Sequence, residues 1–515
     1  MAATESQKYR FSEAPLWELQ RSYYEQLGLK AWNNDQVPQY ITSNPMIGDA
    51  YAELIFGFLQ DRASQGELEE AVTLVELGAG AGRLAYHVLH ELSLLRTYAQ
   101  VALPPLRYVM TDLALKNVEG WRGHPALAPF IAEGTLDFAT FDAERDTELK
   151  LLVSGEKIQP GQLRQPLLVV ANYFFDAIPQ ELIYIGEGLV YDCDVVVGSA
   201  DPEPGLTVSE QLKRITLSYE HRRAPRFEEE GYPYRDVIEM YRHELEDSHV
   251  LFPEIGLRCL ERLGQLSRAG FAMITADKGD HRLDNWRFAE PPQLVHHGSI
   301  SLTANYHAIQ HVFERRGAEA LFTDHHYNNI NVACILMLES PKRYVNTRLA
   351  YRKSVARFGP DDFFSLKLWA DREIEKMRLQ QILAFWRLGG YDAEWFIQTA
   401  KRISSLLEGA NDEEKLDLRA GILRMWTSFY IMPQRYDLAL DAGLILFEMD
   451  MYADAKMLLD ASAESDDDPV STVYFCLAIC SLELEQEDEA RTYLQRALEL
   501  EPDHEEALTL LKALG

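Results

Sequence analysis

Three glycines that alternate with single residues follow an apolar run in the segment VTLVELGAGAGRL. A glycine-rich turn between a strand and a helix lets a ligand approach the backbone where a Cβ atom would block it. Gly78, Gly80 and Gly82 meet that need, and Ala79 between them is small as well. The spacing departs from the dinucleotide pattern G-x-G-x-x-G, because the third glycine comes one residue too early. The segment predicts a loop for a different ligand, unless the glycines serve only backbone packing.

Glu76, two residues before the first glycine, indicates the charge of that ligand. A carboxylate at the end of a strand repels a pyrophosphate and attracts a cation. S-adenosylmethionine is a cation of this kind, since it has an ammonium and a sulfonium group. We predict that the loop binds S-adenosylmethionine as methyl donor, with S-adenosylhomocysteine as the product.

Polar residues at the ends of three further apolar runs fit the rest of such a ligand. Asp112 ends RYVMTD, where an acid can accept hydrogen bonds from both ribose hydroxyls, and Asp142 follows LDFATF, where it can accept from the adenine amino group. Asn172 ends PLLVVAN and leads into a polar and aromatic loop. The carboxyl ends of strands are where open α/β sheets bind their ligands.

The elements that must position these residues extend from about residue 73 to residue 338. Short apolar runs alternate there with longer segments of helical pattern, and most of the runs are continuous rather than alternating. Such runs predict a mostly parallel, doubly wound α/β sheet of the Rossmann-like kind, covered by helices on both faces. We count LIYIGEGLVYDCDVVV as one of its strands. The segment of about residues 198–250 is predicted as an insertion, either a lid over the substrate or a solvated pair of helices.

Five segments in order resemble signatures of the MidA-like family of class I methyltransferases. They are PQYITSNPMIGDAYAELIFGFL, VELGAGAGRL, VVANYFFDAIP, GFAMITADKG and GSISLTANYHAIQHVFERRGAEALF. The resemblance runs from about Tyr23 to Leu338. It implies a class I methyltransferase that acts on a protein side chain.

The resemblance also implies site residues. Phe174, Phe175 and Asp176 would line the acceptor side. The cofactor contacts would fall on Thr42, Ser43, Glu76, Gly78, Gly80, Gly82, Asp112, Asp142 and Asn172, with Ala79 inside the glycine loop.

Three positions depart from the family pattern. Tyr173 replaces a glutamate, and Asn305 and His307 replace the histidine and aspartate of T-A-H-V-D-F. A buried guanidinium needs paired acids. The acceptor nitrogen therefore stays open between arginine and histidine.

Methyl transfer is an in-line displacement, so the protein must hold the acceptor atom close to the methyl group in a dry pocket. A charged acceptor must also lose a proton. The candidate bases are Asp176, which we favour, Asp277 and His307. Tyr173 and Phe174 would wall the methyl group or stack on a flat acceptor, or else pack in the core.

Beyond about residue 341 the strand pattern ends and helix follows helix. The last segment has the small and large positions of a tetratricopeptide repeat, at Ala478, Ala490, Tyr493, Ala497, Leu498 and Pro502. We predict a methyltransferase domain over residues 1–345, which begins with a helical segment of residues 1–70, and a repeat-like helical domain over residues 346–515. The tail would recruit a peptide, form a homodimer, or cap the catalytic domain.

Composition excludes several kinds of partner. The formal net charge of −31 opposes nucleic acid, although a basic protein or peptide would suit it. No run approaches the roughly 20 apolar residues of a membrane span, and no secretory signal is recognisable, so we expect a cytoplasmic protein without membrane contact. The five cysteines form no CxxC pair, and His307 and His311 lack a matching ligand, so we expect no metal site.

The leading hypothesis is thus a protein methyltransferase whose helical tail recruits the substrate. One alternative is an assembly scaffold with a degenerate methyltransferase fold. Another is a methyltransferase for a small molecule.

Overall fold

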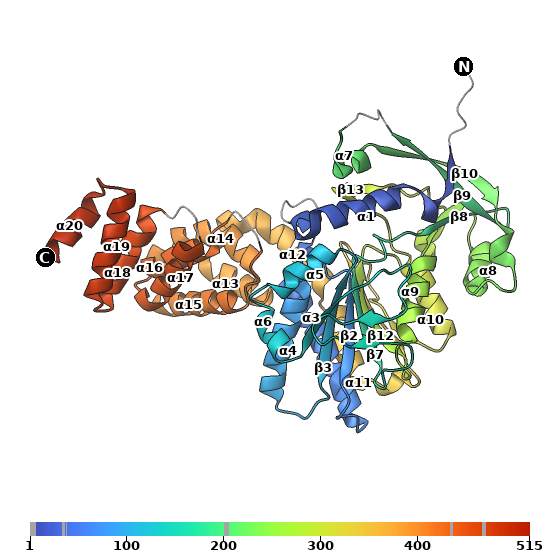
Figure 1. Cartoon of the computed structure of the whole chain (residues 1–515), viewed down its shortest axis with the longest axis horizontal. Coiled ribbons are helices and arrows are strands. Elements are labelled where there is room, and N and C mark those ends of the chain that lie inside the picture. Colours follow the sequence, from blue (N-terminus) through green and yellow to red (C-terminus); the bar gives the residue numbers. More distant parts are fainter. Residues whose placement is uncertain are drawn as a thin grey trace, which may run out of the picture. The chain divides into compact units, whose positions relative to one another are not determined.

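The computed structural model describes residues 7–32, 37, 39–199, 205–432, 436–465 and 470–514. The chain divides into two compact units, Met1–Ser365 and Leu366–Gly515 (Figure 1). The first unit extends beyond the predicted boundary at residue 345 because α11 (Val345–Tyr351) packs along α3 (Pro45–Ser64). Asp61 of α3 accepts hydrogen bonds from the backbone N–H groups of Asn346 and Thr347, at 3.0 and 2.9 Å. This carboxylate satisfies donors at the start of α11 and fixes it to unit 1.

The main sheet of unit 1 has seven strands in the order β15-β16-β12-β7-β2-β3-β4. The five strands from β12 to β4 run parallel, and β16 is antiparallel to both of its neighbours. Their bounds are β2 Val72–Leu77, β3 Leu106–Asp112, β4 Leu136–Thr140, β7 Leu167–Asn172, β12 Phe271–Asp277, β15 Glu319–Leu321 and β16 Asn331–Met337. The parallel strands follow the order 3-2-1-4-5 of doubly wound nucleotide-binding folds. The predicted α/β class is confirmed.

Helices cover both faces of this sheet. Figure 1 shows α3 and α4 (Arg83–Ala99) on one side, and α9 (Glu254–Gly264) and α10 (Tyr306–Arg315) on the other. All six residues of β2 are buried, and β12 is buried throughout as well. Burial on both faces explains why these strands read as continuous apolar runs.

A second, antiparallel sheet replaces one predicted strand of the main sheet. It has the order β1-β9-β8-β11, with β10 on β9, and its bounds are β1 Lys8–Arg10, β8 Glu181–Gly186, β9 Leu189–Ser199, β10 Ile215–Arg223 and β11 Ser248–Phe252. LIYIGEGLVYDCDVVV forms the β8–β9 hairpin, so its assignment to the main sheet is wrong. Glu187 and Gly188 at the turn have φ of 52° and 68°. Two positive φ values match a tight hairpin turn, which reverses the chain.

The predicted insertion is part of this larger excursion. Its described residues form the end of β9, α7 (Val208–Lys213), β10, α8 (Arg235–Glu244) and the start of β11, while residues 200–204 lie outside the described part. It is therefore neither a pair of helices nor separate from the β8–β9 hairpin.

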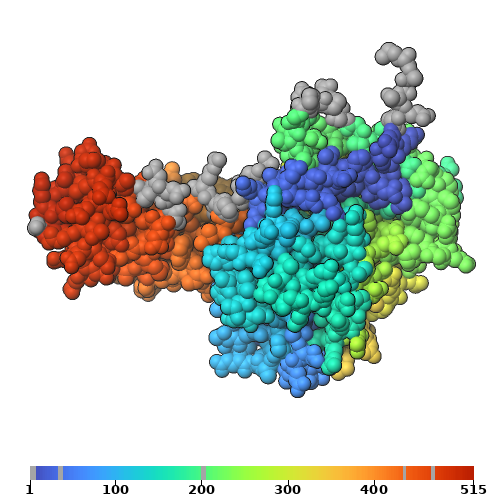
Figure 2. All heavy atoms as spheres, viewed as in Figure 1, coloured from blue at the N-terminus to red at the C-terminus, as the bar shows by residue number. Residues whose placement is uncertain are grey.

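In the N-terminal segment, β1 and the short helix η1 (Phe11–Glu13) are followed by α1 (Leu16–Leu27), the short helix η2 (Gly28–Trp32), α2 (Tyr40–Ser43) and α3. Asn44 caps α3 by accepting the Ile47 N–H at 3.1 Å, and Pro45 occupies the first turn. In Figure 2 the dark blue N-terminal segment lies against the cyan part of unit 1.

Unit 2 is all-helical in its described residues, as predicted. After α12 (Pro360–Glu373), which spans the boundary, come α13 (Leu379–Leu388), α14 (Ala393–Leu406), α15 (Asp412–Thr427), α16 (Leu438–Glu448), α17 (Tyr452–Ser465), α18 (Ser471–Glu483), α19 (Glu487–Leu500) and α20 (Glu505–Ala513). Successive helices from α16 to α20 pack on one another. One continuous apolar core extends from Ala370 to Cys480, which is the stacking expected of repeats that cannot bury a core alone. Within the described chain, no helix is both long and apolar enough to span a bilayer.

Candidate functional site

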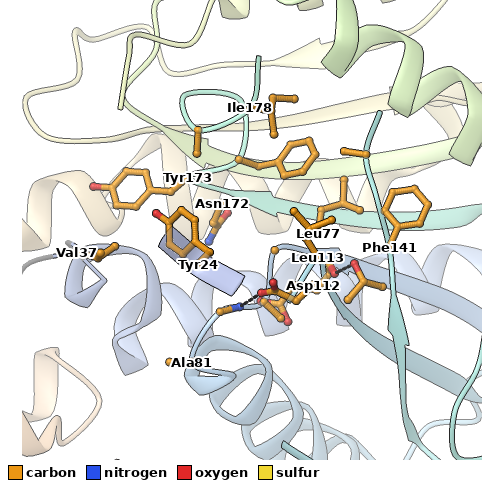
Figure 3. Close-up of a pocket in the computed structure, with 18 of the residues that line it drawn as sticks. Tyr24, Val37, Leu77, Ala81, Asp112, Leu113, Phe141, Asn172, Tyr173 and Ile178 are labelled. Atoms are coloured by element: carbon orange, nitrogen blue, oxygen red, sulfur yellow. Dashed lines mark hydrogen bonds between the residues drawn. The ribbon is translucent and has the colours of Figure 1, made fainter. Parts of the chain in front are cut away.

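A cavity of about 240 Å³ lies at the carboxyl ends of β2, β3 and β7 (Figure 3). Eleven of the sequence-predicted site residues line it: Thr42, Ser43, Glu76, Gly78, Ala79, Gly80, Asp112, Asp142, Asn172, Tyr173 and Phe174. Gly82, Phe175, Asp176, Asp277 and His307 do not line it. The structure thus brings together most of the residues expected to hold a cofactor. The three candidate bases, Asp176, Asp277 and His307, all lie outside the cavity lining.

The glycine loop connects β2 to α4 through three left-handed residues. Gly78, Gly80 and Gly82 have φ of 63°, 55° and 81°, a region that residues with a Cβ atom rarely adopt. Gly82 is the N-cap of α4. A Cβ atom on Gly80 would lie 2.8 Å from the Trp32 ring, whereas the nearest atom to one on Gly78 would be 3.9 Å away. Conformation requires glycine throughout the loop, and close packing also requires it at Gly80.

Glu76 has a buried carboxyl group that accepts a hydrogen bond from a tyrosine hydroxyl. It is 4% exposed, accepts a hydrogen bond from the Tyr108 hydroxyl at 3.1 Å, and forms no ion pair in the part of the chain that the structure describes. Burial raises the pKa of Glu76 to about 8, and the Tyr108 hydroxyl opposes this shift. A cation bound beside it would stabilise the charged form.

Asp112 organises the glycine loop from the end of β3. Its carboxylate accepts the N–H of Gly80 at 3.2 Å and that of Ala114 at 2.9 Å. Burial raises the pKa of Asp112, and these backbone hydrogen bonds oppose the rise. A carboxylate has about four acceptor positions, so a ligand hydroxyl could share this carboxylate with the loop.

Asp142 lies beyond β4 and forms an ion pair with α1. Arg21 donates to its carboxylate at 2.7 Å, and the Glu144 N–H donates to the other oxygen at 2.9 Å. Both Arg21 and Asp142 line the cavity. The pair ties the N-terminal helix to the wall of the main sheet.

The amide of Asn172 joins the end of β7 to the N-terminal helices. Its oxygen accepts the Tyr51 hydroxyl at 2.6 Å, and its nitrogen donates to the Thr42 carbonyl at 3.3 Å. The Ser43 hydroxyl donates to the Gln39 carbonyl at 2.7 Å. These hydrogen bonds fix the cavity wall. The Tyr51 and Ser43 hydroxyls act in them as donors, so their oxygens can still accept a hydrogen bond.

The loop after β7 is held in a strained conformation. Tyr173 has φ of 47°, and Phe174 meets Phe175 edge to face with ring centroids 5.3 Å apart. Asp277, at the end of β12, accepts the N–H groups of Phe175 and Asp176 at 3.1 and 3.2 Å. A carboxylate from a neighbouring strand thus fixes the turn that directs Tyr173 and Phe174 to the cavity.

Asp176 and Asp277 are buried together. Burial raises the pKa of Asp176 to about 7, while Lys278 opposes the rise. Burial and the charge of Asp176 raise the pKa of Asp277 well above its ordinary value. Two neighbouring carboxylates cannot both ionise readily, so the pair keeps a proton near neutral pH.

His307 lies on α10, and its Nδ1 is 3.0 Å from the Tyr241 hydroxyl. Burial lowers the pKa of His307 to about 4, so the ring is neutral at physiological pH. Its contacts are with α8 rather than with the cavity.

Residues of the N-terminal segment complete the cavity and were missed from the sequence. Trp17, Gln20, Arg21 and Tyr24 of α1 all line it, together with Trp32. Figure 3 shows Tyr24 beside Tyr173 and Asn172. The α1 residues are spaced i, i+3, i+4 and i+7, which is one face of a helix. This spacing was the available signal.

Comparison with known proteins gives a family match within unit 2 and matches to several solved structures. The tetratricopeptide repeat family matches residues 471–504, which include α18 and α19, so the predicted repeat is confirmed there. None of the curated proteins compared with this sequence matches it.

Two of the solved structures that match are described as COG1565 superfamily proteins from Burkholderia thailandensis. An uncharacterized protein is 14% identical, with a TM-score of 0.41 over 65% of this chain and 90% of its own. A second protein, described as a "likely methyl transferase" bound to S-adenosyl-homocysteine, is 16% identical, with a TM-score of 0.40 over 61% of this chain and 74% of its own.

Proposed function

We propose that unit 1 is an S-adenosylmethionine-dependent methyltransferase of the MidA-like kind, which methylates a nitrogen of a protein or peptide side chain. The observation that carries the proposal is the set of Glu76, the glycine loop and Asp112 around one cavity at the carboxyl ends of parallel strands. S-adenosylhomocysteine is the expected product.

The chemistry of the lining residues fits this cofactor. Glu76 offers a cation a carboxyl group that forms no ion pair with the described residues, and Asp112 offers a second carboxylate as acceptor for ligand hydroxyls. Leu113 and Phe141 supply apolar surface beside Asp112 for a flat ring (Figure 3). The open space above Gly78 lets the ligand reach the backbone.

When bound, the cofactor supplies a methyl group on a sulfonium centre. The residues of this chain then have three tasks: to bind the cation, to hold the acceptor in line, and to exclude water. Glu76 performs the first, because its ionised form balances the positive charge. Tyr173 and Phe174 perform the second from their strained loop, and α1 with Trp32 covers the cavity.

The cavity best fits an acceptor nitrogen that belongs to a flat, uncharged side chain. The carboxylates that line the cavity are Glu76, Asp112, Asp142 and Glu144, and none lies on the loop of Tyr173. Asp176, the favoured base, does not reach the cavity lining. An imidazole has a free lone pair at neutral pH and needs no prior deprotonation, whereas a guanidinium does. Histidine is therefore the proposed acceptor residue, ahead of arginine.

A protein substrate is supported by the repeat in unit 2 and by the net charge of −31. Repeats of this kind present extended binding surfaces, and the acidic balance favours a basic partner. A small-molecule acceptor is the second candidate, favoured by the cover that α1 forms over the cavity.

The experiment is a calorimetric titration of the full chain with S-adenosylmethionine and S-adenosylhomocysteine. Binding that is lost in Glu76→Gln and in Asp112→Ala would support the cofactor site. Glu254→Gln is the matched control, because Glu254 is a buried carboxylate of unit 1 that does not line the cavity. If the folded wild-type protein binds neither compound, the methyltransferase hypothesis is refuted, and the assembly scaffold remains as the alternative hypothesis.

Transfer of a radioactive methyl group to a cell lysate then identifies the acceptor class. Label in protein bands that becomes 1- or 3-methylhistidine after hydrolysis supports the proposal. Label only in the small-molecule fraction supports the second candidate.

A further inference from the structure

Cys193, His221 and His249 come from three strands of the second sheet and meet on one of its faces. Their sulfur and ring nitrogen atoms all lie within 4.8 Å of one another. Cys193 of β9 and His221 of β10 are paired directly across the ladder. His249 of β11 is paired with Tyr184 of β8, which is paired in turn with Tyr191 of β9. Paired residues and alternate residues share a face of a sheet, so the register brings the three side chains together.

The orientation of His249 is fixed by its other ring nitrogen. Nδ1 is 3.1 Å from the Ala289 carbonyl oxygen, which can only accept, so Nδ1 carries the hydrogen. The lone pair is therefore on Nε2, which points at the Nε2 of His221 at 3.1 Å. Histidines that bind metals donate their second N–H to a carbonyl or carboxylate in this way.

His221 is held by stacking. The Tyr184 ring lies parallel to it, with centroids 4.0 Å apart and 9° between the planes. The Tyr184 hydroxyl donates to Asp247 at 2.8 Å, so Tyr184 is fixed as well. Both imidazoles are thus positioned before any ion binds.

We propose that Cys193, His221 and His249 form a binding site for one zinc ion. Around a tetrahedral zinc ion the two nitrogens would lie about 3.3 Å apart and each nitrogen about 3.5 Å from the sulfur, from bond lengths of about 2.0 and 2.3 Å. The imidazoles already have nearly this spacing, and the sulfur, which lies within 4.8 Å of both nitrogens, needs a shift of at most about 1.3 Å. Binding replaces the S–H bond of Cys193 by an S–Zn bond, and the proton goes to solvent.

The donor set favours zinc over the hard cations. Thiolate and imidazole suit zinc and related transition metals, whereas calcium and magnesium take oxygen ligands. His221 is exposed, which leaves the fourth position to water or to the nearby carboxylate of Asp247. None of the three residues lines the cavity at the main sheet. The ion would connect β9, β10 and β11, and so stabilise the second sheet.

The test uses full-length protein without an affinity tag, first treated with a chelator and then titrated with cobalt(II) as a spectroscopic substitute. We expect one equivalent to bind, with visible bands of a tetrahedral ion and a sulfur-to-cobalt charge-transfer band in the near ultraviolet. Zinc should displace the cobalt and raise the melting temperature of the protein.

Three variants assign the ligands. Cys193→Ser should abolish the charge-transfer band, and His221→Gln and His249→Gln should each weaken binding at least tenfold. Cys259→Ala is the matched control, because Cys259 is a buried cysteine of unit 1 outside the cluster and should leave the spectrum unchanged. His221 is exposed, so His221→Gln should fold even if Cys193→Ser does not.

Absence of cobalt binding, or binding that His221→Gln leaves unchanged, would overturn the proposal. The contact between the two imidazoles would then be an ordinary N–H···N hydrogen bond.

Discussion

At the scale of single residues, the site is built from buried carboxyl groups whose protonation depends on what lies beside them. Glu76 has no cationic partner among the described residues. Asp176 and Asp277 are buried beside each other. Burial disfavours the charged form of all three. Each group therefore links a measurable property of the protein to pH.

Glu76 should make cofactor binding depend on pH. Its pKa of about 8 means that the free protein holds the proton at lower pH, and a cationic ligand must expel it. The dissociation constant of S-adenosylmethionine should increase about tenfold for each pH unit below 8, and should level off above 8. Calorimetry between pH 6 and 9 measures it. A dissociation constant that stays the same from pH 6 to pH 8 would contradict this role of Glu76.

The Asp176–Asp277 pair should lower stability as pH rises. The folded pKa of each group is raised above its unfolded value, so the native state binds more protons and loses stability as pH increases through that window. In Asp277→Asn the amide oxygen still accepts the two loop N–H groups and no second charge forms. The melting temperature of the variant relative to wild type should therefore rise by a few degrees from pH 5 to pH 8, at about 1.4 kcal/mol for each pKa unit.

Asp277→Ala is the control for this prediction. It leaves the N–H groups of Phe175 and Asp176 without an acceptor, at a cost of about 1–3 kcal/mol each, so it should be less stable at every pH. If the melting temperatures of wild type and Asp277→Asn change by the same amount between pH 5 and pH 8, the proposed shared proton is contradicted.

At the scale of elements, the turn between β2 and α4 lines the cavity together with residues of α1 and with Trp32 of η2. Trp32 lies on Gly80, and Trp121 donates to the Gly80 carbonyl at 3.0 Å. The turn is thus packed from both sides. Little space is left for any larger residue.

Gly80→Ala should weaken S-adenosylmethionine binding at least tenfold. Its Cβ atom would lie 2.8 Å from the Trp32 ring, and alanine is strained at φ of 55°. Gly66→Ala separates these causes, because Gly66 has φ of 84° with nothing within 4 Å of a Cβ atom, outside the cavity. It should lose stability and keep its affinity. Equal affinity in the two variants would mean that the ligand does not depend on this loop.

The sequence predicted those elements whose pattern is local. Strands such as β2 and β12 were recognised because burial on both faces leaves a continuous apolar run. The β8–β9 hairpin was assigned to the wrong sheet because Glu187–Gly188 divides one long apolar segment. A two-residue turn containing glycine was the overlooked signal.

The site was predictable where a motif stands at a strand end and not where distant segments meet. Glu76, Gly80 and Asp112 could be found by spacing alone. Trp32, like the α1 residues, reaches the cavity through long-range packing. The approach of Cys193, His221 and His249 depends on the register of three strands, which the sequence does not state.

At the scale of the molecule, the chain divides into two compact units. The apolar core described for unit 2 extends from Ala370 to Cys480. Binding of the cofactor and recruitment of a partner can therefore be tested separately.

A chain that ends after Glu373 should bind S-adenosylmethionine within about twofold of the full chain and lose methylation of its protein substrate. It keeps α12 whole, which matters because Asp361 accepts the N–H groups of Asn329 and Ile330 at 2.7 and 3.0 Å. Calorimetry and transfer of a labelled methyl group measure the two properties. Unchanged protein methylation would show that unit 2 does not recruit the substrate.

The attachment of α11 to α3 also determines when unit 1 can finish folding in the cell. Asp61 and Thr347 are 286 residues apart, and a ribosome adds about 5–20 residues per second. Thr347 is therefore synthesised roughly 15 to 60 s after Asp61. Until then, Phe58 lacks the Tyr344 ring that stacks on it, with centroids 5.1 Å apart. Strand β16 is also still missing from the sheet. The nascent chain therefore exposes this apolar surface until the residues of α11 have been synthesised.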